Sequence, residues 1–365
     1  HLIHTEYLLA GRSHRDPREI LRDTMFAATV TGSPVENACR LIATYETEGR
    51  GYYGAALALF GRDREGRHTM DSPILIRTAD VDPAGRVKIT AGATLVRDSH
   101  PSYEVAETHA KAGGILSAFG LVPPATVPAL DVAGLARDED VLLALHDRNQ
   151  RLSSFWLADQ AGAPSDPALR GKHVRIIDGE DEFVNMLRHV LGVLGLTSDV
   201  VRHDELEPDV EGSLDRFIDG ADLVIVGPGP GDPRDGDDPK MATLRAAVGR
   251  LLEREHPFLA VCLGHQALCH HLGLDLGYKD IVFQGTQSPV SIDGRTEQVG
   301  FYNTFVARAA GDLPTGVSVE ADPDSRDVHL VRGPHFRGIQ FHAESILTEH
   351  GYDLVHDLVR DLLQR

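Results

Sequence analysis

The chain has 365 residues, more than one ordinary core accommodates, and this length predicts two domains. Acidic residues outnumber basic ones by 55 to 36, and the resulting net charge of -19 repels polyphosphates and argues against a nucleic-acid partner. Three cysteines without a CxxC pair argue against a disulfide framework or a zinc site, and no apolar stretch is long enough to span a bilayer, so we expect a cytoplasmic protein with no membrane partner.

The front segment, residues 1–122, mixes helical and strand patterns. Pro17 after Asp16 is a typical helix start, and turn-rich stretches separate the apolar runs that follow. The pattern predicts a helix, three strands and a second helix in chain order: 17–30, 52–61, 72–81, 85–96 and 102–120.

A connecting segment follows over residues 123–171. Proline-bearing stretches at 121–130 and 161–172 read as linkers. Between them, "DEDVLLALHDRNQRLSSFWLADQ" has apolar residues at roughly helical spacing, which predicts one connector helix docked on its neighbours.

Beyond the connector, residues 172–365 alternate buried-type strands with helices. The apolar runs "VRIID", "ADLVIVG", "PFLAVC" and "RGIQFH" indicate strands, and helical stretches at 182–195 and 240–255 lie between several of them. This alternation predicts a doubly wound α/β domain with a parallel sheet.

One predicted strand ends at a cysteine, Cys262, with a glycine two residues later. A tight strand-to-helix turn would expose the sulfur, and the N–H groups and dipole of the following helix would favour a thiolate and stabilise an oxyanion. On this stretch alone, a small buried cysteine explains the residue equally well.

Two further strand ends favour the nucleophile. "VIVGPGPGDP" places three glycines after a strand, where backbone can approach a ligand closely. "GIQFHAES" ends a strand at His342, with Glu344 two residues later. Because the carboxyl ends of parallel strands gather at one edge, Cys262, His342 and Glu344 form a candidate nucleophile, base and orienting carboxylate.

These motifs resemble the class I glutamine amidotransferases, over roughly residues 172–365. The resemblance implies that Cys262 attacks the side-chain amide of L-glutamine and releases ammonia, while His342 carries the proton and Glu344 orients His342. It also implies an oxyanion hole formed by the N–H groups of Gly229 and Leu263. The implied glutamine-binding positions are Gln266, Gly231, Thr304 and Phe305.

The amidotransferase motifs depart from the family pattern at three places. Ala260 stands where members often have glycine, "HAES" replaces the commoner His-Pro-Glu, and "FYNTF" replaces the usual Tyr-His-Ser. These changes leave the proposed triad intact. Cys269 is assigned no chemistry.

The front segment resembles the carboxyl half of the chorismate-utilising enzymes, which include anthranilate, isochorismate and salicylate synthases. The motifs "TVTGSPVENACRLI", "GRGYYGAALALFG", "SPILIRTA", "AGATLVRDS" and "EVAETHAKA" occur in the family's order. Chorismate is a dicarboxylate, and an arginine that ends a predicted buried strand could grip one carboxylate with two parallel hydrogen bonds. The implied chorismate-binding positions are Tyr53, Arg77, Gly92, Ala93, Thr94 and Lys111, with Thr94 replacing the last glycine of the family's Gly-Ala-Gly loop.

The same resemblance implies Mg²⁺ as the cofactor. Glu107 would bind the metal, with Glu104 supporting it through water, although Glu107 and Lys111 at helical spacing also fit a plain surface ion pair. His4 would be the general acid near the departing C4 hydroxyl, and His1 is a weaker rival. The family's upstream metal-binding glutamate and first half are missing, so we expect a longer polypeptide and an incomplete chorismate site.

The order of synthase then amidotransferase resembles the fused anthranilate synthases and their phenazine-type relatives, the 2-amino-2-desoxyisochorismate (ADIC) synthases. "HTEYLLAGRS", "RNQRLSSFWL" and "VGFYNTF" resemble the phenazine type, whose product keeps its enolpyruvyl group. That resemblance implies a homodimer in which ammonia passes from one chain to the other, although a connector of this length could also fold back. Two alternatives remain: a fused anthranilate synthase that eliminates pyruvate, and a non-catalytic module for the front segment.

Overall fold

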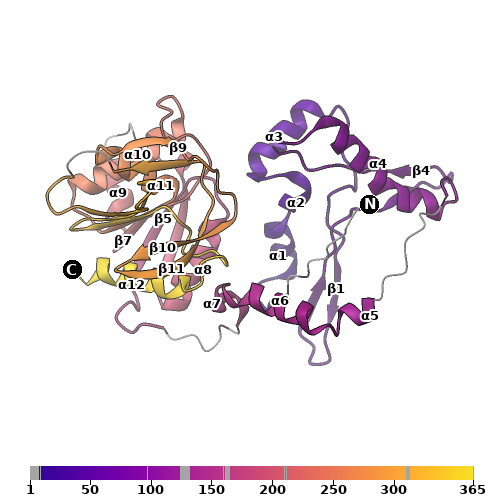
Figure 1. The fold of residues 1–365 in the computed structure, drawn as a ribbon, viewed down its shortest axis with the longest axis horizontal. Coiled ribbons are helices and arrows are strands. Elements are labelled where there is room, and N and C mark those ends of the chain that lie inside the picture. The colour runs from indigo at the N-terminus through magenta and orange to yellow at the C-terminus, as the bar shows by residue number, and fades with distance from the viewer. Residues whose placement is uncertain are drawn as a thin grey trace. The chain divides into compact units, whose positions relative to one another are not determined.

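The computed structural model describes residues 8, 10–96, 98–123, 132–158, 160, 165–208, 210, 212–309 and 313–364. The chain divides into two compact units, His1–Leu130 and Asp131–Arg365, and each is described by itself (Figure 1).

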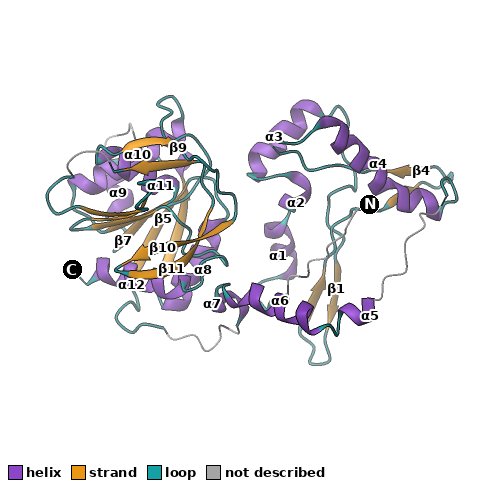
Figure 2. Cartoon of the chain, viewed as in Figure 1, coloured by secondary structure: helices purple, strands orange, loops and turns teal. Residues whose placement is uncertain are grey.

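The back unit is built on a central sheet with helices on both sides (Figure 2). Its seven strands have the order β13-β14-β15-β8-β7-β5-β6. The five strands from β15 to β6 run parallel, and β14 and β13 continue the sheet antiparallel. The strands are β5 (His173–Asp178), β6 (Thr197–Arg202), β7 (Leu223–Val226), β8 (Phe258–Val261), β13 (Ser318–Ala321), β14 (Val328–Arg332) and β15 (Phe336–Ile339). The predicted parallel α/β sheet is confirmed.

Two apolar cores cover the two faces of this sheet, as the period-2 alternation of a strand requires. Ile176 of β5 packs in one core with α8 and α12, whereas Ile177 packs in the other with α9, α10 and α11. The helices are α8 (Phe183–Leu194), α9 (Ser213–Ile218), α10 (Pro239–Glu253), α11 (Leu263–His271) and α12 (Gly351–Leu363), with a 3₁₀ turn at His203–Glu205. Helices on both faces make the domain doubly wound.

Local sequence explains where the back-unit helices begin and end. The Asp238 carboxylate accepts a hydrogen bond from the Lys240 N–H at the start of α10, and Pro239 occupies the first helical position. Helix α8 ends at Gly195 in the left-handed conformation. Two antiparallel pairs complete the unit: β9 (Asp275–Tyr278) with β12 (Phe305–Arg308), and β10 (Thr286–Ile292) with β11 (Arg295–Phe301).

The connector belongs to the back unit and is not the single helix that we predicted. It forms α5 (Val132–Leu135), α6 (Glu139–Gln150) and α7 (Ser154–Leu157). The helix breaks before Ser153, whose backbone N–H bonds the carbonyl of Ile346 at 2.8 Å instead of a carbonyl one turn earlier. Tertiary contact therefore overrides the helical spacing of the apolar residues.

The front unit has short elements and two antiparallel hairpins. Its helices are α1 (Pro17–Thr24), α2 (Ala28–Thr31), α3 (Val35–Tyr45) and α4 (Pro101–Ala118), and its strands are β1 (Leu59–Arg62), β2 (His68–Asp71), β3 (Ala79–Val81) and β4 (Val87–Ile89). No described side chain from residue 8 to residue 123 is buried. The unit, as described, has no apolar core of its own.

The predicted front strands are correspondingly too long. The run at 52–61 contributes only the start of β1, and the run at 72–81 contributes β3 and an isolated bridge between Ile74 and Ala56. Arg77 was predicted to end a buried strand, but it is exposed, lies outside any strand and has a positive φ of 54°. Two-stranded hairpins without a packed face support only short strands, so β-type composition alone overestimated their length.

None of the helices within the described ranges is both long and apolar enough to cross a membrane.

Candidate active site

Cys262 sits at a sharp turn between β8 and α11. Strand β8 ends at Val261 and helix α11 begins at Leu263. Between them, Cys262 has φ 51° and ψ -102°, a backbone conformation that residues other than glycine rarely adopt. A Cβ on Gly264 would lie 2.2 Å from the carbonyl oxygen of Val226, so only glycine fits there. The predicted strand-to-helix turn is present, with the cysteine at its strained centre.

His342 and Glu344 follow strand β15 and contact each other. His342 Nδ1 lies 2.8 Å from Glu344 Oε1, and both side chains are at most 1% exposed. Burial lowers the pKa of His342, but the Glu344 carboxylate and Cys262 outweigh it and hold that pKa well above its ordinary value. His342 Nε2 has no hydrogen-bond partner within the described chain, so it is available to the thiol or to a substrate.

Two aromatic rings hold the His342 imidazole from other elements. Phe183, at the start of α8, lies with its ring centroid 4.5 Å from that of His342, and Tyr302 lies at 5.1 Å. The Tyr302 hydroxyl is 2.9 Å from Ser345 Oγ, on the segment that follows β15. The imidazole orientation is therefore restrained by a tilted and an edge-on ring contact as well as by Glu344.

The glycine-rich loop after β7 packs backbone to backbone against the loop after β5. The Gly179 N–H donates to the carbonyl of Pro228 at 3.1 Å. A Cβ on Gly229 would lie 2.1 Å from the carbonyl oxygen of Gly179. Gly229 must therefore be glycine for this loop to keep its place at the carboxyl end of the sheet.

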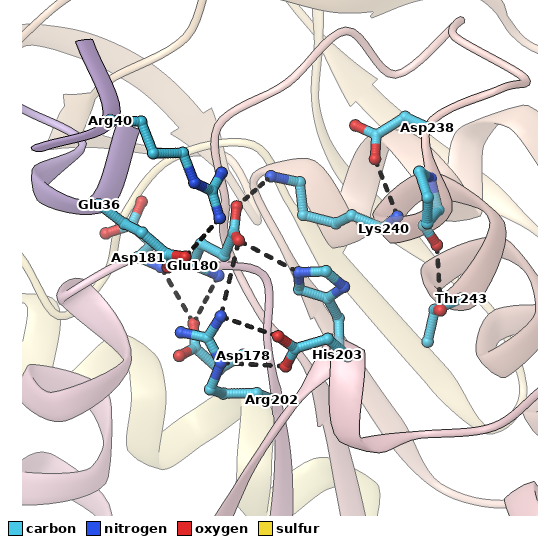
Figure 3. Close-up of polar contacts among 12 residues, drawn as sticks. Glu36, Arg40, Asp178, Glu180, Asp181, Arg202, His203, Asp238, Lys240 and Thr243 are labelled. Atoms are coloured by element: carbon cyan, nitrogen blue, oxygen red, sulfur yellow. Dashed lines mark hydrogen bonds and ion pairs between the residues drawn. The ribbon is translucent and has the colours of Figure 1, made fainter. Parts of the chain in front are cut away.

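An ion pair fastens the loop after β5 to α10 (Figure 3). Lys240, 7% exposed, donates from Nζ to Glu180 Oε2 at 2.9 Å, and His203 Nε2 lies 3.4 Å from Glu180 Oε1. Partial burial would raise the pKa of Glu180, but Lys240 and then His203 lower it overall. The Lys240 stem also passes 3.7 Å from the position of a Cβ on Gly231.

The predicted glutamine-binding residues are partly engaged with one another. Gln266 donates from Nε2 to the carbonyl of Phe305 at 2.7 Å and to Gln340 Oε1 at 2.9 Å. Gln340 Nε2 in turn lies 3.6 Å from Cys262 Sγ. The carbonyl of Thr304 accepts the Lys279 N–H at 2.8 Å. Gln266 is thus linked to the Cys262 thiol through Gln340.

In the front unit, four of the predicted residues come together. Lys111 Nζ donates to the carbonyl of Gly92 at 3.0 Å and forms an ion pair with Glu107. The Tyr53 hydroxyl lies 2.8 Å from the position of a Cβ on Gly92, so the Tyr53 side chain packs closely against the backbone of this loop. Ala93 is the next residue of the same loop and is partly buried.

Other predicted front residues lie apart from this group or outside the description. Thr94 is exposed and donates to the carbonyl of Thr29 at 3.4 Å. His4 and its rival His1 lie outside the described residues. Arg77, as noted above, is exposed outside any strand.

The described residues contain no group of three or more side chains of the metal-binding types. Glu104 and Glu107 are three residues apart on α4, which places both on one helical face. Mg²⁺ is commonly held by one or two carboxylates with water completing its shell, so this donor set suits the ion.

A family model for class I glutamine amidotransferases matches residues 175–362, the part of the chain that carries the cysteine, histidine and glutamate. This chain belongs to that family. A second model, for chorismate binding enzymes, matches residues 1–117.

Curated relatives of this amidotransferase match all or half of the chain. Proteins named "Anthranilate synthase, phenazine specific" from Pseudomonas chlororaphis and Pseudomonas fluorescens are each 44% identical to it, over 370 and 373 residues. Both alignments cover 100% of this chain and 55% of the relative. Anthranilate synthase component II of Haloarcula marismortui is 34% identical over 200 residues, covering 50% of this chain and 95% of its own. The chain thus spans about half the length of the two phenazine-specific relatives.

The sequence did not reveal several residues of the amidotransferase site. One such residue is Gln340, which precedes His342 by two positions. Because alternate residues of a strand lie on the same face, this spacing could have shown that Gln340 and His342 share a face. Asp181 is on the loop after β5. Burial raises the pKa of its carboxyl, and the nearby charge of His342 opposes that rise. In the front unit, Arg50 lies 5.9 Å from the centroid of the Tyr53 ring, and no role was predicted for it although it lies in the same motif as Tyr53.

Proposed function

We propose that this chain hydrolyses L-glutamine and contributes to the amination of chorismate to ADIC by the longer protein of which it forms part. The proposal depends on one arrangement above all: a strained, strand-end Cys262 beside a buried His342 that contacts Glu344 at 2.8 Å. Nucleophile, base and orienting carboxylate at adjacent strand ends are the components of amide hydrolysis.

In the proposed glutaminase reaction, the Cys262 thiol gives its proton to His342 Nε2 and the sulfur attacks the glutamine side-chain carbonyl carbon. The backbone N–H groups of Leu263 and Gly229 stabilise the resulting oxyanion. His342 then protonates the leaving nitrogen, the carbon–nitrogen bond breaks, and ammonia departs. Water, deprotonated by His342, hydrolyses the thioester and regenerates Cys262 with release of glutamate.

Residues around the glutamine pocket have proposed supporting roles. Gly231, Gln266, Thr304 and Phe305 line the substrate glutamine. Gln266 is 3% exposed and already bonded to Phe305 and Gln340, which gives it a fixed orientation toward the thiol.

In the front unit, Lys111, Tyr53 and the backbone at Gly92 and Ala93 are proposed to contact chorismate. Glu107 would bind Mg²⁺, and Glu104 would support the ion through water. When bound, this metal would neutralise a substrate carboxylate that the strongly acidic chain otherwise repels. His4 is proposed as the general acid, and Arg77 as a second carboxylate contact that needs a rearranged loop.

The phenazine-specific names of the two 44% identical relatives support the ADIC product. The same printed names contain "anthranilate synthase", so a fused enzyme that eliminates pyruvate is the second candidate. Mass spectrometry of the products that the full-length protein forms from chorismate, glutamine and Mg²⁺ separates the two. ADIC retains the enolpyruvyl group, whereas anthranilate with stoichiometric pyruvate contradicts the first candidate.

We further propose a cytoplasmic homodimer in which one chain feeds ammonia to the other. The test mixes full-length Cys262→Ser with full-length Glu107→Ala. Each variant alone is expected to lack glutamine-dependent amination of chorismate. Heterodimers hold one intact site of each kind, so crossed feeding restores glutamine-dependent amination. Feeding within one chain predicts no recovery.

A further inference from the structure

The connector segment that contains α7 lies directly on the loop that carries the catalytic residues. The Ser153 N–H donates to the carbonyl of Ile346 at 2.8 Å, and Ser153 is only 1% exposed. Gln287 Nε2, from β10, bridges the carbonyl of Arg151 at 2.6 Å and that of Leu347 at 2.8 Å. Connector and catalytic loop are therefore joined by one direct hydrogen bond and by a bridge through the Gln287 side chain.

Trp156 makes the contact that bears most closely on chemistry. Its indole Nε1–H donates to the backbone carbonyl of Glu344 at 2.8 Å. The side chain of the same Glu344 orients His342. Because Glu344 is 1% exposed, its carbonyl has little access to water, and the indole satisfies an acceptor that would be costly to leave unpaired.

Aromatic packing fixes the place of the Trp156 indole. Phe155 stacks on Tyr352 of α12 with centroids 4.8 Å apart, and its ring meets that of Trp156 edge-on at 5.0 Å. The Trp156 ring also lies 5.5 Å from that of His189 on α8. The indole is thus held between two helices, and its N–H points at the catalytic loop.

The start of α12 is bound to the same loop. A Cβ on Gly351 would lie 1.9 Å from the carbonyl oxygen of Ala343, so helix and loop are in backbone contact. The contact between Gly351 and Ala343 joins the loop to the helix that follows it in sequence. The Trp156 side chain instead reaches the Glu344 peptide from the connector, which precedes the sheet in sequence. The connector therefore supplies a restraint that the amidotransferase sheet and helices alone do not provide.

We propose that Trp156 is a positioning residue for glutamine hydrolysis, acting through the Glu344 peptide to keep the Glu344 carboxylate on His342 Nδ1. This inference rests on the proposed glutaminase function. Loss of the indole N–H would leave this peptide held only at its other end, where the Ser345 N–H donates to the His342 carbonyl at 3.1 Å. The carboxylate's hold on the imidazole would then weaken, and the pKa of His342 would fall. Cys262 and the Asp181 carboxyl also act on His342, and Trp156 contacts neither of them directly.

The test compares Trp156→Phe with Phe155→Leu in the full-length protein. The phenylalanine at 156 keeps an aromatic ring but has no N–H to donate. Phe155→Leu loses the ring contacts with both Tyr352 and Trp156 but keeps the indole N–H that can donate to Glu344. Glutaminase kcat and KM, the pH profile of kcat and the thermal midpoint are measured for each.

For Trp156→Phe we expect kcat to fall about five- to tenfold, the effect of one hydrogen bond, with KM changed less than about twofold. We also expect the high-pH limb of kcat, where the imidazolium deprotonates, to move to lower pH. Phe155→Leu should lower the thermal midpoint without moving that limb.

Wild-type kcat and an unmoved limb in Trp156→Phe would overturn the inference. Parallel losses in both variants with neither limb moved would overturn it too, because they indicate packing alone. A wild-type protein that hydrolyses no glutamine would overturn the proposed function itself, and the inference with it.

Discussion

Replacing Gly229 with alanine should nearly abolish glutaminase activity while leaving the fold intact. The new Cβ would stand 2.1 Å from the carbonyl oxygen of Gly179, a separation that real Cβ atoms do not adopt. Neither side yields easily, because both partners are backbone and Gly179 is itself bonded to Pro228 at 3.1 Å. The two loops must therefore move apart.

The size of that movement sets the expected effect. The loops must separate by about 1 Å, and a misplacement of that order in an active site costs roughly 10²-fold in rate. Loss of one oxyanion donor costs roughly 10²- to 10³-fold in kcat. We therefore expect kcat for glutamine hydrolysis to fall by about 10²- to 10³-fold, with a smaller change in KM.

The same loop offers a matched control. Gly236 has nothing within 4 Å of the position of its Cβ and does not have a positive φ, so Gly236→Ala should keep wild-type kcat. Glutamate release is measured for both variants, with thermal midpoints to confirm folding. A Gly229→Ala enzyme within about threefold of wild type would refute the reasoning that this backbone contact positions an oxyanion donor.

Three further predictions address the nucleophile, the base and the metal. An electrophilic glutamine analogue should label Cys262 and spare Cys269, because Cys269 is fully buried and burial raises the pKa of its thiol; peptide mapping that finds label on Cys269 would contradict this. Glu344→Gln should lower the pKa of His342, because the Glu344 carboxylate helps to raise that pKa above its ordinary value of 6.5. The variant should therefore lose unfolding free energy, most of all below pH 6.5. This loss should shrink as the pH rises through the folded-state pKa of His342. Denaturant titrations at several pH values measure that loss, and a pH-independent loss would show that Glu344 does not control the imidazole. Glu107→Ala in the full-length protein should remove most Mg²⁺-dependent amination and leave basal glutaminase, and amination that is equal with and without Mg²⁺ would contradict the metal assignment.

The sequence predicted the amidotransferase unit well because its signals are local and repeated. Buried parallel strands such as Leu223–Val226 and Phe258–Val261 are continuous apolar runs, and their ends carry the residues of the site. The strained turn at Cys262 lies where strand β8 ends, and Gly264 two residues later packs against the carbonyl of Val226. The strand ends can be read from the local sequence, whereas the contact between Gly264 and Val226 cannot.

Other parts of the chain depend on contacts that local pattern does not contain. The break before Ser153 depends on a hydrogen bond to Ile346, almost two hundred residues away in sequence. The long strands predicted around Ile74 fail because the front unit offers them no packed partner surface. Gln340 was overlooked because its role is visible only once Gln266 and Cys262 lie beside it.

The residue that contacts Glu344 from the connector is also the only tryptophan in the chain. Indole fluorescence from this chain therefore has a single source, half-buried against α8 and α12, and its emission reports whether the connector is seated on the back unit. The front unit contains no tryptophan and, as described, no buried side chain. Unfolding of the front unit alone would therefore leave the tryptophan emission unchanged. Tyrosines, by contrast, occur in both units, among them Tyr53 and Tyr302. Comparing the two emissions therefore distinguishes a change at the connector from a change elsewhere in the chain, without adding a label.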